Sequence, residues 1–209
     1  MSQLESKKHF IYILGTFAFF LFTIADTIIK LIGDLYKDTV IFSIASFSAI
    51  IPVCIYLFYR QSLTEIKTQN YKLHIIRGVL MTLTYYFIVK GIILLPLSIA
   101  YPIILSAPVL LSVLGIVVLK ESVSFSKIFS LVLAMTAVFI VSGFSLSEGF
   151  DLQGVIFLVL GVIAVACLDF SVRVFGKDER TMALTFYSML FSGSIFLIFS
   201  LNHFGNILF

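Results

Sequence analysis

The sequence predicts an all-α membrane protein with about seven transmembrane helices. Of its 209 residues, 60% are hydrophobic and only 12% are charged, whereas soluble domains are about 45–50% apolar and about 25% charged. So few polar side chains cannot cover a surface in water. The apolar residues form unbroken runs rather than an alternating pattern, which excludes a transmembrane β-barrel. The remaining possibility is a bundle of α-helices, because each helix satisfies its backbone polar groups internally in lipid.

Seven apolar runs have the length of about 20 residues that crosses a bilayer. The first run follows a polar, basic tail and lacks the small-residue cleavage site of a signal peptide, so we interpret it as a span. Only Pro96 separates the third run from the fourth, which indicates a tight turn. A merged helix of about 45 residues would be far longer than the bilayer is thick. The seven expected spans are residues 10–31, 40–59, 75–95, 97–119, 125–144, 152–172 and 181–201.

The basic residues predict an orientation. With a cytoplasmic N-terminus, three of the fourteen Lys and Arg residues (Lys30, Lys37 and Lys90) lie on the outer side, and the other eleven lie on the inner side. This asymmetry follows the positive-inside rule. The high content of Phe, Ile and Lys is typical of an AT-rich bacterial genome, so we expect an integral protein of the bacterial inner membrane.

A local pattern near the end of the first span recurs near the end of the sixth, 143 positions later. The pattern is an acid, a base four residues on and a glycine three residues after that: Asp26, Lys30 and Gly33, then Asp169, Arg173 and Gly176. The sixth and seventh spans occupy the places of the first and second after the same offset. A repeat of five helices must enter the membrane from opposite sides in successive copies, and such inverted repeats are typical of secondary transporters.

The repeat predicts three segments. Residues 1–8 form a cytoplasmic tail, residues 9–144 a complete five-helix repeat, and residues 145–209 the first two helices of an inverted second repeat. A full second copy would run to about residue 290. We therefore expect a truncated chain, with a natural seven-helix form as the alternative.

Several residues fit a known pattern. The stretch from Gly91 contains a small residue, Ala100, and a mid-helix proline, Pro108, and then an apolar run that ends with Leu119-Lys120-Glu121. The same pattern includes Lys30 near the end of the first span and the pair Arg77-Gly78 at the start of the third. In these features the chain resembles the EamA-type transporters of the drug/metabolite transporter superfamily. It departs from them at Ser130 and Ala137, where the family often has Gly, and in lacking Trp in its first span. The resemblance implies a ten-helix carrier of small organic molecules.

Polar residues at helical spacing form stripes on three of the apolar spans. One hypothesis is that these stripes converge on a substrate cavity near the membrane midplane, between the repeats. The alternative is that they only join helices through hydrogen bonds and close contacts. The substrate-path candidates are Thr82, Tyr86 and Lys90 in the third span, Ser98, Tyr101 and Ser112 in the fourth, and Thr185 and Ser188 in the seventh.

Charged residues inside a membrane are costly and mark functional sites by default. Asp26 and Lys30, like Asp169 and Arg173, are four residues apart, so each couple is expected to form a pair within its helix. The alternative is that these four residues gate the path or sense the substrate. Lys90 has no acid within four residues, so it must pair across helices, extend to the interface or face a substrate anion.

Two prolines, Pro102 and Pro108, interrupt the fourth span. Proline removes a backbone hydrogen bond and bends a helix. Such a bend either serves alternating access or is a static feature of the fold.

The sequence favours a secondary carrier of a small organic metabolite. It contains no GxxxxGK[ST] phosphate loop and none of the HExxH or GxSxG motifs of enzymes, so we expect no enzymatic activity, no cofactor and no metal. The expected partners are a small-molecule substrate and membrane lipids, with a homodimer as a further option and no nucleic acid. The alternative is a truncated or degenerate membrane protein without transport activity of its own.

Overall fold

The computed structural model describes residues 2–33, 35–121, 124–142, 151–176 and 178–205, in which helices joined by short connectors are the regular secondary structure. Within this part, six segments are long and apolar enough to cross a membrane. They comprise α1 (Ser2–Ile32) from Tyr12 onward, α2 (Asp38–Arg60), α3 (Tyr71–Leu94), α4 (Leu97–Ile104) with α5 (Ala107–Leu119), α7 (Leu152–Phe175) and α8 (Thr181–Gly205) to Leu201. The predicted all-α membrane fold is confirmed.

The remaining expected span, residues 125–144, coincides with α6 (Phe125–Ser142). Its 18 residues extend about 27 Å at the usual helix rise, slightly less than a hydrocarbon core of about 30 Å. Residues 143–150, which hold the predicted end of this span and the predicted boundary between the repeats, lie outside the described residues. One short 3-10 turn, η1 (Leu63–Ile66), connects α2 to α3.

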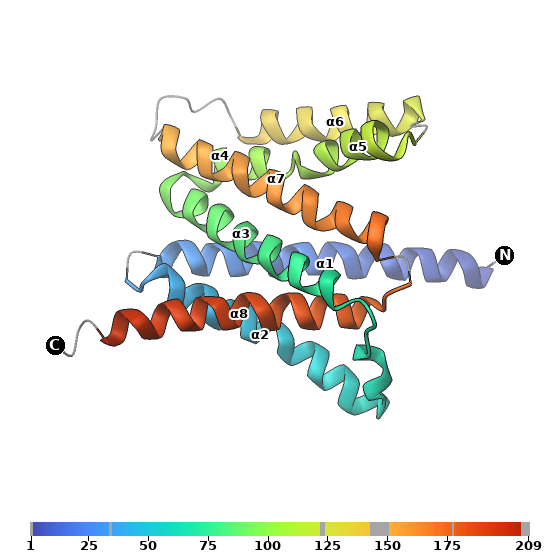
Figure 1. Ribbon diagram of the computed structural model, residues 1–209. Coiled ribbons are helices and arrows are strands. Elements are labelled where there is room, and N and C mark those ends of the chain that lie inside the picture. Colours follow the sequence, from blue (N-terminus) through green and yellow to red (C-terminus); the bar gives the residue numbers. More distant parts are fainter. Residues whose placement is uncertain (1, 34, 122–123, 143–150, 177, 206–209) are drawn as a thin grey trace.

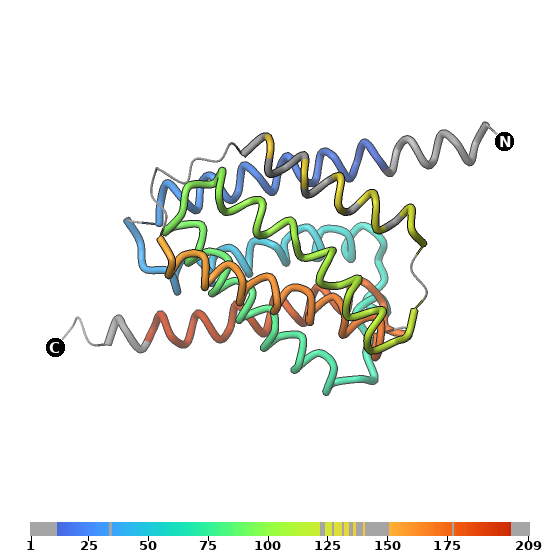
Figure 2. Tube along the Cα trace, turned by 90° about the horizontal axis from the view of Figure 1, so that it is seen from above, coloured from blue at the N-terminus to red at the C-terminus, as the bar shows by residue number. Residues whose placement is uncertain are grey.

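Successive spans run in alternating directions along the bundle, as Figure 1 shows. Helix α7 therefore runs opposite to α1, and α8 opposite to α2, which is the relation that inverted repeats require. Figure 1 places the beginning of α1 and the end of α8 at opposite ends of the bundle, and Figure 2 shows the same bundle from above. We call the end where α1 and α3 finish the Lys30 end, and the end where α7 turns into α8 the Glu179 end.

Helix α3 lies at the centre of the fold. It packs mainly against α7 and α8, while α2 packs against α8. One buried cluster joins α2, α3 and α8 through Ile41, Phe42, Val89 and Phe196. A second joins α3, α4 and α7 through Ile92, Leu95, Ala100 and Leu158. In lipid, such contacts stabilise the fold through close packing rather than through the hydrophobic effect.

Glycines allow α3 and α7 to approach closely. A Cβ atom on Gly91 would collide with the Leu158 side chain and lie 3.1 Å from the Gly154 carbonyl oxygen. A Cβ atom on Gly161 would lie 2.7 Å from Ile88 Cδ1 and 3.1 Å from the Ile88 backbone nitrogen. Small residues at helix interfaces are the usual means of close packing in membranes. Both glycines are therefore determinants of the central α3–α7 contact.

Candidate functional site

The fourth span has a short break in its helix. The structure divides the predicted helix of residues 97–119 into α4 and α5, with Leu105 and Ser106 between them. Pro108 lies in the first turn of α5, where the missing N–H of proline costs nothing. At the break, the Leu105 backbone nitrogen donates to the Tyr101 carbonyl at 2.8 Å, and Ser106 Oγ donates to the Ile103 carbonyl at 2.6 Å.

The break lies deep in the membrane. The eight residues of α4 cover about 12 Å at the usual helix rise, close to half the thickness of the hydrocarbon core. Discontinuous helices at this depth form the binding sites of many secondary transporters. Pro102 and Pro108 lie on either side of this break, where proline is expected to weaken the helix, and the bend predicted from them stays a prediction.

Asp26 and Tyr101 meet beside this break. The Tyr101 hydroxyl donates to Asp26 Oδ2 at 2.9 Å, and the Asp26 side chain is only 5% exposed. Asp26 lies about 9 Å before the end of α1, inside the span. A carboxyl group at such a depth is costly unless it is hydrogen-bonded or used in function. The structure thus unites two of the sequence-predicted residues in one buried polar contact.

Lys30 joins α1 to the end of α3. Its Nζ atom donates to the carbonyl oxygens of Ile92 and Leu95, both at 2.7 Å. The last carbonyls of a helix lack partners within the helix and carry partial negative charge, so a lysine is well placed there. The predicted pair between Asp26 and Lys30 is thus wrong, because each side chain reaches a partner on a different helix.

We expect Lys30→Met to weaken the attachment of α1. A hydrogen bond from a charged donor contributes about 1.5–3 kcal/mol. Water or lipid headgroups can replace part of the lost bonding in the variant, so we expect the free energy of unfolding to fall by an amount near the lower end of this range. Thermal unfolding of the detergent-purified protein measures this loss. Lys37→Met, which removes an exposed lysine beyond the end of α1, is the control and should change the midpoint little. Equal midpoints for both variants would contradict the anchoring role.

Lys90 forms an ion pair with Asp38, from the last turns of α3 to the first turn of α2. Of the three possibilities that the sequence left open, pairing across helices is the one observed. Both side chains are partly exposed, at 33% and 24%. The sequence did not point to Asp38 as the partner, because Asp38 begins a different helix and no spacing rule relates the two.

The second predicted pair, Asp169 with Arg173, makes no direct ion pair, although the charge of Arg173 interacts with that of Asp169. Arg173 Nη1 instead lies 3.4 Å from Glu121 Oε2, just beyond the end of α5. The buried Arg77 on α3 lies near the same part of α7. Its Nη1 atom donates to the Leu168 carbonyl at 2.9 Å and to Ser171 Oγ at 3.2 Å. Arg77 thus bonds to the α7 backbone beside Asp169, whose own side chain is exposed.

The remaining path candidates make separate contacts. Three of their hydroxyls donate to carbonyls of their own helix: Thr82 to Gly78 at 2.8 Å, Ser112 to Pro108 at 2.8 Å and Ser188 to Leu184 at 2.6 Å. Tyr86 packs edge-on against Phe42 and Phe157, Ser98 is exposed, and Thr185 is half-buried. The cavities that the described residues line have other side chains in their walls. A shared central cavity therefore stays a prediction.

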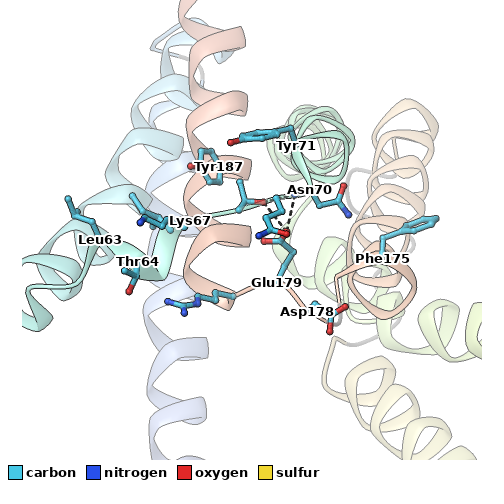
Figure 3. Close-up of a pocket in the computed structure, with 13 residues that line it drawn as sticks. Leu63, Thr64, Lys67, Asn70, Tyr71, Phe175, Asp178, Glu179 and Tyr187 are labelled. Carbon is cyan, nitrogen blue, oxygen red and sulfur yellow. Dashed lines mark hydrogen bonds between the residues drawn. The ribbon is translucent and has the colours of Figure 1, made fainter.

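A cavity of about 1170 Å³ opens at the Glu179 end. Figure 3 shows its polar wall, with Glu179 at the centre and side chains from η1, the start of α3 and the turn between α7 and α8 around it. The sequence did not identify this site, because its residues lie in two loops more than 100 positions apart. Among the described residues, no group of three His, Cys, Asp or Glu side chains is arranged to hold a metal ion.

Comparison with known proteins gives one match. The sequence profile of the EamA-like transporter family matches residues 9–143, which is well over half of the chain. No curated protein and no solved structure matches the chain.

Proposed function

Because the chain belongs to the EamA-like transporter family, we propose that it carries a small organic metabolite across a membrane by alternating access. The family membership and the apolar spans make it an integral membrane protein of the drug/metabolite transporter type. The mechanism and the substrate are the parts that we propose.

The contact between Asp26 and Tyr101 is the observation that carries the proposal. It brings a carboxyl group from α1 to the first half of a broken helix, within the thickness of the membrane. A substrate that crosses a bilayer needs polar partners at this depth, and Asp26 is a buried carboxyl group there. We infer that Asp26 is the group that meets a polar or cationic part of the substrate, with Tyr101 orienting its carboxyl.

The break in the fourth span supports the proposal that α4 moves during transport. The short helix α4 contacts α7 and α6, whereas Tyr101 also bonds to α1. Rotation of α4 about Leu105 and Ser106 would break the bond between Tyr101 and Asp26 without unwinding either half-helix. Such hinges lie at the ends of elements, where a few residues absorb the change in backbone angles.

We propose that the protein lies in the bacterial inner membrane with the Glu179 end in the cytoplasm. Eleven of the fourteen basic residues fall on the side of the N-terminus, and the positive-inside rule places that side in the cytoplasm. Only 11% of the α1 span and 11% of the α4–α5 span are buried within the structure. Lipid chains or a second copy of the chain would cover these two spans.

Purified protein in liposomes tests the proposal directly. A panel of amino acids, nucleosides and polyamines would first be screened for a rise in thermal midpoint, because a ligand at about 100 times its Kd stabilises by about 2.7 kcal/mol. Each stabilising compound would then be tested as a radiolabel in counterflow. We expect at least one compound to exchange faster than in protein-free liposomes. Stabilisation without any counterflow would contradict transport.

A further inference from the structure

Glu179 connects two segments of the chain that are distant in sequence. Its Oε1 atom accepts a hydrogen bond from Thr68 Oγ1 at 2.9 Å and another from the Asn70 backbone nitrogen at 3.2 Å. Thr68 and Asn70 lie in the connector between α2 and α3, inside the first predicted repeat. Glu179 lies in the turn between α7 and α8, inside the second. These two bonds therefore tie the predicted repeats together.

His74 completes the network. Its Nε2 atom lies 2.8 Å from Thr68 Oγ1 and 3.6 Å from Glu179 Oε2, and its ring packs on Tyr187 with 4.8 Å between ring centres. His74 is 5% exposed and Glu179 is 10% exposed, so the contact is shielded from water. Hydrogen bonds to a charged group in such a setting are stronger than those at a surface.

A second link lies beside the first. Arg180 Nη1 is 3.3 Å from Glu65 Oε1, but the two side chains are 49% and 37% exposed. Exposed ion pairs contribute little, and salt screens them further. Both links border the cavity of about 1170 Å³, whose walls come from both segments (Figure 3). The Glu179 network is therefore the stronger tie across this cavity.

The Lys30 end is built differently. The polar contacts described there, Lys90 with Asp38 and Lys30 with the end of α3, join helices within the first segment only. Among the described residues, the polar contact between the segments nearest to that end is a long hydrogen bond, 3.4 Å, from Ser43 Oγ to the Gly193 carbonyl. The strong polar ties between the two segments thus concentrate at the Glu179 end.

We propose that Glu179, Thr68, Asn70 and His74 form the latch that closes the Glu179 end of the transporter. This inference rests on the proposed alternating access and adds the gate to it. Release of Glu179 leaves the exposed pair of Arg180 with Glu65 as the weak described link between the α7–α8 turn and the α2–α3 connector, and the cavity between them widens toward the spans. Closure re-forms the two hydrogen bonds to Glu179 and returns the His74 ring to its place between Thr68 and Tyr187.

Distances across the cavity test the latch without a substrate. Leu63→Cys and Phe175→Cys place one spin label on each side of the cavity, and Cys54→Ala with Cys167→Ala removes the native thiols. Pulsed electron resonance on the full chain in liposomes then reports the distance between the labels. We expect the shorter distance to dominate in the otherwise native protein, with a minor longer population. In Glu179→Ala the ratio of the longer to the shorter population should rise on the order of tenfold, which corresponds to about 1.4 kcal/mol.

Asp178→Ala is the matched control. Asp178 is the adjacent acid on the same cavity wall, outside the Glu179 network, and its loss should leave the distance distribution unchanged. Thr68→Val removes the hydroxyl shared by Glu179 and His74 at nearly constant volume, and should raise the longer population several-fold. If Glu179→Ala does not fold, Thr68→Val is the variant that tests the latch.

Native distances in folded Glu179→Ala, or in Thr68→Val when Glu179→Ala does not fold, would overturn the latch. The same increase in Asp178→Ala would overturn it too, because loss of charge alone would then explain the opening. The test also separates this inference from the proposed function. If the distances change as expected but the protein shows no counterflow, transport alone is refuted. Counterflow with unchanged distances would refute the latch alone.

Discussion

Asp26→Asn is expected to reduce transport at least about tenfold while leaving the protein folded. The amide oxygen of asparagine still accepts the hydrogen bond from Tyr101, which is 2.9 Å long in the native protein, so the packing around a side chain that is 5% exposed is retained. Asparagine carries no negative charge, however, and cannot form a charge-assisted contact with the substrate. Such a contact contributes about 1.5–3 kcal/mol, so counterflow should fall at least about tenfold.

Two further variants define what the loss means. Asp38→Asn removes the acid that pairs with Lys90 at the Lys30 end, outside the buried site, and should leave counterflow near the native rate. Tyr101→Phe keeps the carboxyl but removes its hydroxyl partner, and we expect partial activity with about 1–3 kcal/mol lower stability. Native counterflow in Asp26→Asn would show that Asp26 serves only the fold. Joint loss of counterflow and of the thermal midpoint would assign it to folding.

Gly91→Ala is expected to destabilise the protein strongly, because it forces the two central helices apart. The new Cβ atom would collide with Leu158 and approach the Gly154 carbonyl oxygen to 3.1 Å. The Gly154 backbone is part of α7 and cannot rotate away, so α3 and α7 must separate. Overpacking of this kind costs about 1–3 kcal/mol, and the α3–α7 contact is the most extensive of the fold.

Gly15→Ala is the matched control for this effect. A Cβ atom on Gly15 would meet no atom within 4 Å, and alanine is better than glycine in a helix interior by about 0.5–1 kcal/mol. The two identical substitutions should therefore shift stability in opposite directions, measured as unfolding midpoints in the same detergent. A lower midpoint for Gly15→Ala, or an unchanged one for Gly91→Ala, would contradict the close packing of α3 on α7.

Hydropathy located the spans well because it is a local property. Each of the six described spans overlaps a run predicted from composition alone, and the ends differ by a few residues. The turn at Pro96 is also confirmed, since α3 ends at Leu94 and α4 begins at Leu97. Backbone groups in lipid must be satisfied within the helix, so a long apolar run has one available structure.

The candidate site was only partly predictable. Asp26, Lys30 and Tyr101 stood out because charged and polar groups are rare within a membrane, and all three make specific contacts. Their partners did not follow from spacing. The rule for residues four apart paired Asp26 with Lys30, yet interhelical groups, a tyrosine hydroxyl and free carbonyls, satisfy both side chains better.

The sequence by itself determined that this protein is a helical membrane protein, where its spans lie and which family pattern it follows. These properties depend on hydropathy and on short motifs, and both are read along one chain. Only the tertiary structure decided that Lys90 pairs with Asp38, that Arg173 meets Glu121 and that Glu179 ties two distant loops together. Helical spacing tells which side chains share a face, but the group opposite that face comes from the packing of another helix.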